Sequence, residues 1–322
     1  MLKDNLRQID TVVSKINTHP EYSAEVYKEK SHALRAEAEK HSLEIELANE
    51  KRILTNKERK LFLGRLDSAA DFLSREGIDN YTLSKLGYLI EPDQNPAQGF
   101  RNEHLKFGGF NAVDPERVQY RIQHLVDILQ NPDIHPVIRA SNAHLELVEI
   151  HPYMDGNGRA ARMLQNFCLQ QRNYPVAIID SEEVKDYLNV LHKALEKRYN
   201  GETSVFTPCE NEIRFHEFIS QRVLSSAISL EKELEKRKAY EIKLTNLDQP
   251  GIAFSISKIF KCLGRKTNKN ISVSIDKRKG ERKSETLSVK GDIGRDDLKK
   301  ILMGCSKKYR IGFAISDGTN KP

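Results

Sequence analysis

Cysteine is scarce in this sequence, and no long hydrophobic run occurs. Cys168, Cys209, Cys262 and Cys305 are scattered, without a Cys-x-x-Cys pair or neighbouring histidines, which excludes a disulfide framework and a zinc ribbon. No apolar stretch approaches the ~18 residues that a membrane span needs, so we expect no membrane insertion. Residues 1–17 lack the apolar stretch of a signal peptide, and we expect a cytoplasmic protein, with secretion into a host cell by a non-classical route left open.

Two common catalytic motifs are also missing. The sequence has neither a Gly-x-x-x-x-Gly-Lys-(Ser/Thr) phosphate loop nor a Ser/His/Asp hydrolase elbow. His124, His144, His192 and His216 lack partners at a metal-ligand spacing. We therefore interpret these histidines as packing, hydrogen-bonding or surface groups.

Charge is divided unevenly along the 322 residues. The chain has a net charge of +6, but residues 239–322 hold 19 Lys and Arg against 9 Asp and Glu, a balance of +10 that leaves −4 for the rest. Such a basic segment attracts nucleic acid, anionic lipid or an acidic protein surface, or is simply a solvated face. Tyr309 and Phe313 are too few aromatic residues for a base-stacking platform, so nucleic-acid binding has weak support.

Apolar residues spaced three and four apart predict a chain that is mostly helical up to about residue 240. An opening helix, interrupted by Pro20, places Ile9, Val12, Val13 and Ile16 on one face. Further helices are predicted over 56–75, 115–130, 136–150, 158–171, 181–199 and 211–240, and the apolar stripe of the first consists of Leu61, Leu63, Leu66, Ala69, Ala70 and Leu73. After Asp248, short alternating segments predict strands at 252–256, 271–275, 286–289 and 310–315, a basic turn at Gly280 and a helix at 296–303.

A distinctive group of functional residues lies between two predicted helices, in the segment HPYMDGNGRAAR, residues 151–162. Gly156 and Gly158 can adopt positive φ and bring backbone N–H groups close to a ligand, and the helix N-terminus behind them favours an anion. Arg159 and Arg162, three residues apart, share one helical face and offer two planar forks to phosphate oxygens. The pattern predicts a site for an anion with more than one phosphate.

Asp155 and His151 refine this prediction. A carboxylate repels phosphate unless Mg²⁺ lies between them, and Mg²⁺ binds one or two carboxylates together with phosphate oxygens and water. The expected ligand is therefore a nucleotide polyphosphate. His151 is the side chain here whose ordinary pKa of ~6.5 lets it accept a proton near neutrality, which makes it the candidate base.

This segment resembles the signature of the Fic family, His-Pro-Phe-x-(Asp/Glu)-Gly-Asn-Gly-Arg-x-x-Arg. Tyr153 replaces the usual Phe, which keeps the ring but requires a partner for the hydroxyl. The similarity covers roughly residues 61–223. It implies a mainly α fold, namely a Fic-type helical bundle with a small β-hairpin flap. We expect an N-terminal helical region at 1–60, the core at 61–240 and a basic α+β unit of unknown role at 241–322.

The resemblance implies AMPylation, the transfer of AMP from ATP to a Ser, Thr or Tyr hydroxyl of a target protein. His151 would be the base, Asp155 would hold Mg²⁺, Gly156, Asn157 and Gly158 would cradle the α- and β-phosphates, and Arg159 and Arg162 would bind the outer phosphates. Transfer of another group, removal of AMP and a homodimer all stay open. The alternative is a catalytically silent Fic-fold protein that acts through its basic C-terminal unit; the intact His151, Asp155 and Arg162 favour the enzyme.

Two upstream segments resemble regulatory and docking elements of the family. Ser42 to Glu46 matches the start of the inhibitory motif (Ser/Thr)-x-x-x-Glu-(Gly/Asn), although Leu47 takes the last position. Glu46 would pair with Arg162 in place of the γ-phosphate; the alternative is a surface helix with solvated glutamates. Segment 99–106 precedes the turn-forming Gly108-Gly109 and lies where relatives carry a flap that docks the target. The alternative is an ordinary hairpin or loop. The candidate flap residues are Phe100, Arg101, Asn102, Glu103, His104 and Leu105.

Overall fold

The computed structural model describes residues 1–18, 24–51, 53–199, 207–236, 239–247, 251–267, 271–276, 284–291, 293 and 295–317. The chain divides into two compact units, Met1–Val13 with Lys28–Ile228 and Ser14–Tyr27 with Ser229–Pro322. The predicted helix interruption at Pro20 and the predicted turn at Gly280 fall outside the described residues. Within the described ranges, no helix is both long and apolar enough to cross a membrane.

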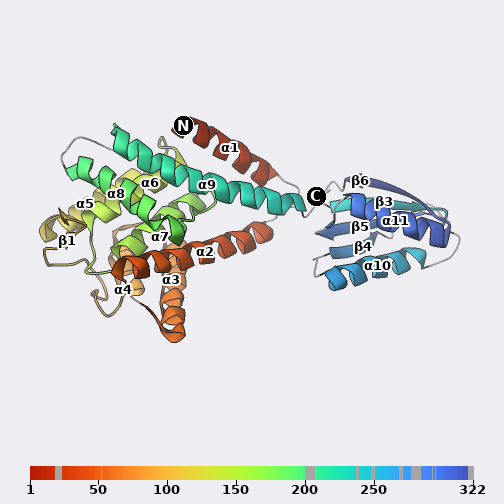
Figure 1. Ribbon diagram of the computed structural model, residues 1–322, viewed down its shortest axis with the longest axis horizontal. Coiled ribbons are helices and arrows are strands. Elements are labelled where there is room, and N and C mark those ends of the chain that lie inside the picture. The colour runs from red at the N-terminus through yellow and green to blue at the C-terminus, as the bar shows by residue number, and fades with distance from the viewer. Residues whose placement is uncertain are drawn as a thin grey trace. The chain divides into compact units, whose positions relative to one another are not determined.

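The first unit is almost entirely helical (Figure 1), which confirms the predicted mainly α fold. Its two short strands, β1 (Lys106–Phe107) and β2 (Phe110–Asn111), form an antiparallel hairpin. The helices that lie wholly or mostly in this unit are α1 (Leu2–Thr18), α2 (Ala24–Glu50), α3 (Asn56–Glu76), α4 (Asn80–Ile90), α5 (Pro115–Gln130), α6 (Pro136–Ile150), α7 (Asn157–Gln170), α8 (Val184–Tyr199), preceded by a 3-10 turn at Ser181–Glu183, and α9 (Glu210–Lys236).

Helix α3 begins and ends where local chemistry dictates. Thr55 and Glu58 form a capping box, in which Thr55 Oγ1 accepts from the Glu58 N–H and Glu58 accepts from the Thr55 N–H at 2.8 Å. Gly77 ends the helix with φ +84°. Its predicted apolar stripe is correct from Leu66 onward, but Leu61 is 55% exposed. At 100° per residue Leu61 lies ~140° around the helix from Leu66, so it faces solvent.

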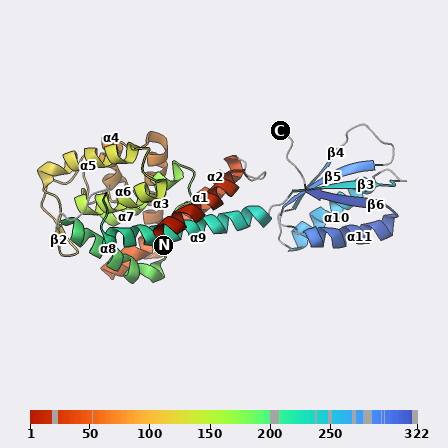
Figure 2. The ribbon, with the colours of Figure 1, turned by 90° about the horizontal axis from the view of Figure 1, so that it is seen from above.

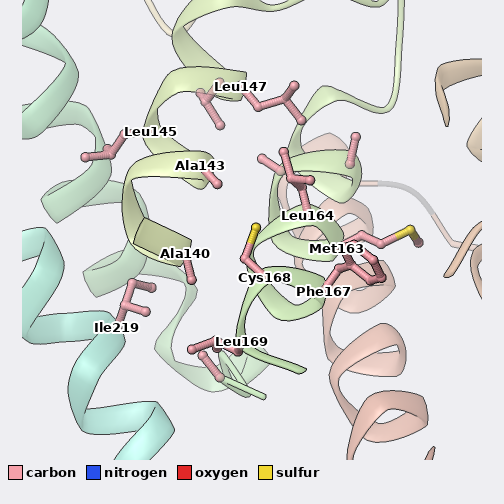
Figure 3. Packing of buried hydrophobic residues seen from close by; sticks show 14 of the residues in the cluster. Ala140, Ala143, Leu145, Leu147, Met163, Leu164, Phe167, Cys168, Leu169 and Ile219 are labelled. Atoms are coloured by element: carbon pink, nitrogen blue, oxygen red, sulfur yellow. The ribbon is translucent and has the colours of Figure 1, made fainter. Parts of the chain in front are cut away.

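Helices α6 and α7 form the centre of the first unit. Ala140 and Ala143 of α6 are fully buried, and Figure 3 shows them on the side that faces Leu164 and Cys168 of α7. Small side chains on one helix leave room for larger ones on the other, so the two backbones can pack closely. This packing fixes the short loop that connects the two helices.

The second unit is a four-stranded antiparallel sheet with the order β4-β5-β3-β6 and two helices. Its elements are β3 (Ala239–Thr245), α10 (Ile252–Thr267), β4 (Ile271–Asp276), β5 (Ser284–Gly291), α11 (Arg295–Tyr309) and β6 (Gly312–Asp317). This β-α-β-β-α-β order is a split βαβ arrangement. Both helices cover one face of the sheet (Figure 2), where Ile242, Leu287, Phe260 and Leu298 are fully buried.

Two predictions near the start of the second unit are wrong. The predicted strand at 252–256 is the first turn and a half of α10: Ala253, Ile256 and Phe260 are buried at helical spacing, while Phe254 is 55% exposed. Over five residues the pattern I-A-F-S-I also alternates, and only a longer window shows the helical period. The helix predicted to reach Tyr240 ends at Lys236, because buried Tyr240, Ile242 and Leu244 alternate along β3.

The expected chemistry of the cysteines agrees with the structure. No disulfide links the four cysteines, all of which lie in described parts of the chain. Cys168 and Cys305 are buried, and burial raises the pKa of the Cys168 thiol to about 12. Cys168 is therefore a packing residue rather than a nucleophile at neutral pH.

Candidate active site

The loop between α6 and α7 depends on two residues in the left-handed region. His151 ends α6 with φ +51°, and Gly156 precedes α7 with φ +84°. The Gly156 carbonyl accepts the first bond of α7, from the Ala160 N–H at 2.9 Å. The first N–H groups of α7 have no acceptor inside the helix, so they are available to an anion.

Two asparagines hold the shape of this loop. Asn157 Oδ1 accepts from the Tyr153 N–H at 2.9 Å, and its Nδ2 donates to the Tyr153 carbonyl at 2.8 Å, so this side chain is committed to the loop itself. Asn95, which the sequence analysis did not identify, accepts from the Met154 N–H at 2.9 Å and donates to the Asp155 carbonyl at 3.0 Å. Nothing in the local sequence around Asn95 signals this role, because its partners are 59 and 60 positions away.

Tyr153 has the partner that its hydroxyl was expected to need. The ring is buried, and the hydroxyl donates to the Leu83 carbonyl at 2.6 Å. A Cβ at Gly87 would lie 2.3 Å from the ring, so glycine is required at that point of α4. Tyr153 therefore fastens the loop to α4.

His151 presents one ring nitrogen for chemistry. Its Nδ1 lies 3.1 Å from the Val148 carbonyl, which can only accept, so Nδ1 carries the proton and Nε2 the lone pair. The ring stacks on Phe107 of the hairpin, with centroids 3.9 Å apart and planes 9° apart. Burial, assisted by the positive charge of Arg101, lowers the pKa of His151 to about 4. The imidazole is consequently neutral at pH 7.

Arg159 lies in a buried row of alternating charges. Its guanidinium contacts Glu91 at 3.0 Å and Asp155 at 3.3 Å, and Glu91 also pairs with Arg65 at 3.1 Å. Arg159 is 3% exposed, whereas the Asp155 side chain is 38% exposed. The Arg159 guanidinium is thus paired with two carboxylates, whereas part of the Asp155 side chain remains accessible to solvent.

Arg162 contacts two residues of α2: Glu46, which was predicted to pair with it, and Ser42, which was not. Its Nε donates to Ser42 Oγ at 2.8 Å, and Nη2 lies 3.3 Å from Glu46 Oε2 and 3.1 Å from the Ser42 carbonyl. Leu47 packs against the hydrophobic core, and α2 continues past it to Glu50. The alternative of a surface helix with solvated glutamates is wrong for Glu46, and also for Glu44, which pairs with Arg59 at 3.3 Å.

A second layer of polar residues supports Arg162. Tyr187 accepts from Arg162 Nη1 at 3.4 Å and bonds His144 Nε2 at 2.9 Å, while His144 Nδ1 bonds Gln165 Oε1 at 2.8 Å. Burial lowers the pKa of His144 to about 3, so it stays neutral. The hydrogen-bonding role expected for His144 is confirmed, whereas Tyr187 and Gln165 were not identified from the sequence.

The hairpin follows the segment expected to dock a target. Its strands begin at Lys106, so residues 100–105 lead into it and Gly108-Gly109 forms its turn. Asn102, Glu103 and His104 are exposed, Leu105 is half-buried, and Phe100 packs against Tyr153 with ring centroids 6.2 Å apart. Arg101 is 3% exposed, so its guanidinium faces the protein interior and is not accessible to a target.

A cavity of about 410 Å³ brings six of the predicted site residues together. Predicted residues that line it are Glu46, His151, Asp155, Asn157, Gly158 and Arg162; Gly156, Arg159 and residues 100–105 do not. Apolar walls come from the hairpin and from α8, through Phe107, Phe110, Leu188, Leu191 and Leu195. The cavity therefore combines a charged floor at the start of α7 with an apolar wall, which suits a ligand with both phosphate and ring parts.

Known proteins share this domain. Residues 81–169 match the model of the Fic/DOC family. Protein adenylyltransferase fic-1 of Caenorhabditis elegans is 36% identical over 109 residues, which cover 33% of this chain and 22% of that protein. Protein adenylyltransferase Fic of Aedes aegypti is 32% identical over 131 residues, 39% of this chain and 25% of that protein. The aligned regions thus span a quarter or less of the length of these relatives.

Solved structures share the fold. A Fic-domain-containing signalling protein from Bacteroides thetaiotaomicron has a TM-score of 0.57 at 21% identity, covering 72% of this chain and 98% of that one. A fragment of Fic-1 from C. elegans has a TM-score of 0.57 at 19% identity, covering 73% of each chain. The sequence match and the structural likeness agree: residues 81–169 match the Fic/DOC family model, and the solved Fic structures share the fold.

Proposed function

We propose that this protein is a Fic-type protein adenylyltransferase, which transfers AMP from ATP to a Ser, Thr or Tyr hydroxyl of a target protein. The observation that carries the proposal is the convergence of His151, Asp155 and Arg162 on one cavity at the start of α7. The names of the curated relatives, which are protein adenylyltransferases, support the same reaction.

His151 is the base in this proposal. As the target hydroxyl oxygen bonds to the α-phosphorus of ATP, its proton passes to Nε2, the nitrogen that carries the lone pair. The bond from the α-phosphorus to the bridging oxygen breaks, and pyrophosphate leaves with the electron pair. The low pKa of His151 keeps the imidazole able to accept a proton at neutral pH.

Asp155 fits a magnesium ion that arrives with ATP. Its carboxylate lies at the cavity and is partly exposed, while Arg159 and the Gly156 N–H hold its two oxygens in place. No group of three or more His, Cys, Asp or Glu that could hold a metal occurs within the described ranges. A single carboxylate suits Mg²⁺, which takes its remaining ligands from phosphates and water. When bound, the ion supplies neutralisation of phosphate charge.

The phosphates would lie on the start of α7. The N–H groups that follow Gly156 offer donors at the positive end of the helix dipole, and Arg162 offers a guanidinium from the second turn. We propose for Arg159 a role other than the phosphate binding that the family motif implies, because Glu91 and Asp155 already contact its guanidinium. We assign it to the orientation of Asp155.

We propose that Glu46 inhibits the enzyme by competing with the outer phosphate for Arg162. The Glu46 carboxylate is 3.3 Å from the Arg162 guanidinium and would lie 3.4 Å from a Cβ at Gly158, so it covers the first turn of α7. A γ-phosphate that binds Arg162 there must displace it. Removal of the carboxylate is therefore expected to raise transfer.

Labelled ATP tests the proposal. The purified chain is incubated with Mg²⁺, a cell lysate and ATP labelled at either the α- or the γ-phosphate. We expect the α-label to be retained on protein, with more retained by Glu46→Gly than by wild type and none by His151→Ala. Retention of the γ-label would instead indicate phosphorylation. No label on any protein with Glu46→Gly would favour the silent binding protein, and release of AMP from modified protein would indicate de-AMPylation.

The role of the basic second unit is a separate question. Tyr309 and Phe313 pack against the core of this unit, which leaves them poorly placed to stack on bases. Nucleic-acid binding and a homodimer stay predictions. Retention on DNA and RNA columns at low and moderate salt, compared between the whole chain and a chain that ends before β3, tests the first, because phosphate contacts are salt-dependent.

A further inference from the structure

Arg101 makes an unusual set of contacts for a buried arginine. It lies between α4 and β1, and all the hydrogen bonds of its guanidinium that the described residues provide go to main-chain carbonyls. Burial lowers the pKa of this guanidinium, so its position has an energetic cost. A cost of this kind is tolerated when the bonds fix a geometry that the protein needs.

The four acceptors belong to two places. Nε donates to the His151 carbonyl at 2.6 Å, and Nη2 reaches the Ile150 carbonyl at 3.3 Å, both at the end of α6. Nη1 donates to the Glu103 carbonyl at 2.5 Å, and Nη2 also donates to the Val113 carbonyl. Glu103 and Val113 flank the hairpin on its two sides, so one guanidinium joins both ends of the hairpin to the residue that carries the imidazole.

The backbone around His151 needs such support. A non-glycine residue with φ +51° has a strained backbone conformation, which persists only where the surrounding structure holds it. Arg101 binds the carbonyl of that residue directly, and its own N–H donates to the Pro152 carbonyl at 2.9 Å. The hairpin held by the same guanidinium supplies Phe107, whose ring stacks on the imidazole.

We propose that Arg101 is a positioning residue, which clamps the hairpin to the end of α6 and so fixes His151 and Phe107 relative to each other. This inference rests on the proposed function of His151 as the base. It replaces the expectation that Arg101 contacts the target, because the side chain is buried and directed at the backbone. Its charge has a second effect, since it disfavours the protonated imidazole, an influence that Asp155 opposes.

Two substitutions separate the hydrogen-bonding geometry of the Arg101 guanidinium from its positive charge. Arg101→Gln removes both, whereas Arg101→Lys keeps the charge but cannot reach four carbonyls. In a Glu46→Gly background we expect both variants to lower kcat for AMP transfer by roughly 100-fold, with KM for ATP within about threefold of the parent, because Arg101 does not line the cavity. Arg117→Gln, a change at an exposed arginine of α5, is the matched control and is expected to have no effect.

Two readouts are independent of activity. Amide hydrogen exchange in the hairpin is expected to accelerate at least about tenfold in both Arg101 variants. The midpoint of His151 in an NMR titration is expected to rise by roughly one pH unit in Arg101→Gln and to stay near the parent value in Arg101→Lys. If the Glu46→Gly parent has no transferase activity but its Arg101 variants still show these changes, the proposed function fails and the clamp stands. Unchanged hairpin exchange together with unchanged kcat in Arg101→Lys would overturn the clamp.

Discussion

In the first unit, polar and charged side chains lie deep among the apolar ones, whereas the described core of the second unit is almost entirely apolar. The buried polar residues of the first unit include Arg101, Arg139, His144, Glu146, Arg162, Gln165 and Glu212; the second unit contributes Ser257. The excess charge of residues 239–322 is carried on the outside, for example by exposed Lys299, Lys300 and Lys307 of α11. The difference indicates that the first unit uses interior polar contacts to hold a site, while the second unit is built around apolar packing.

The largest effect should come from breaking the polar interior of the first unit. The Arg198 side chain is 5% exposed and contacts Glu146 at 2.6 Å and Glu149 at 3.1 Å, as well as Glu212. Arg198→Met would remove one countercharge from these carboxylates and leave Arg121 to pair with Glu146 and Glu149, and we expect the free energy of unfolding to fall by about 3–5 kcal/mol. Urea unfolding followed by circular dichroism measures the change.

The control for this prediction is an ion pair on the surface. Arg214 pairs with Glu210 at 2.6 Å, but both side chains are more than half exposed. Arg214→Met should cost less than about 1 kcal/mol. Equal losses in the two variants would mean that the buried cluster does not stabilise the first unit more than a surface pair does.

The second unit should instead depend on apolar volume. Leu287 of β5 is fully buried, and Leu287→Ala is expected to lower the stability of that unit by about 3 kcal/mol, through lost transfer free energy and the cavity left behind. Its neighbour Ser288 lies on the opposite face of the strand, and Ser288→Ala should change stability by less than about 0.5 kcal/mol. Hydrogen exchange of the β3 and β5 amides measures the change in stability in both variants. Similar exchange rates in Leu287→Ala and Ser288→Ala would contradict the apolar-core description.

Residues 229–322 contain no histidine, so the pH dependence that the described histidines contribute should belong to the first unit. Burial, with a smaller contribution from Arg198, lowers the pKa of His216 to about 3. The unfolded chain takes up a proton near pH 6.5, so the stability that neutral His216 provides is lost as the pH falls from about 6.5 toward 3. Between pH 7 and 5 the loss should be about 2 kcal/mol.

Comparison with His216→Asn isolates this contribution. Asparagine retains a polar group near Nδ1, which bonds Ser141 Oγ at 2.8 Å in the wild type, but it does not titrate. The stability advantage of the wild type over the variant is expected to shrink as the pH is lowered. Parallel stability profiles of the two proteins would show that His216 titrates alike in the folded and unfolded states.

The smallest effect concerns a single hydroxyl behind the site. Tyr187→Phe removes the group that bonds His144 and Arg162, and the buried His144 Nε2 then lacks its partner. We expect a loss of about 1–2 kcal/mol in the free energy of unfolding. Tyr120→Phe, at a 68% exposed ring, should have no measurable effect. A loss of similar size at both positions would argue against a polar network that stabilises the fold.

The sequence was most informative where function depends on consecutive residues. The segment from His151 to Arg162 indicated a loop between two helices with an anion site, and the Ser42 to Glu46 segment indicated the pairing with Arg162 that the structure contains. Periodicity also located α3, α5 and α6, because each has a clear apolar stripe and a chemical start signal. The prediction at 252–256 failed because five residues fit both periods.

Chain order and side-chain chemistry by themselves determined the helical class of the first unit and predicted the ligand chemistry of the loop and the candidate base, since these depend on spacing over a few residues. Tertiary structure alone decided that Arg159 binds Glu91 instead of facing the cavity, that Asn95 braces the loop and that Arg101 joins hairpin and helix. Such partners lie tens of residues apart, and only the packed helices bring a buried donor within reach of its acceptor.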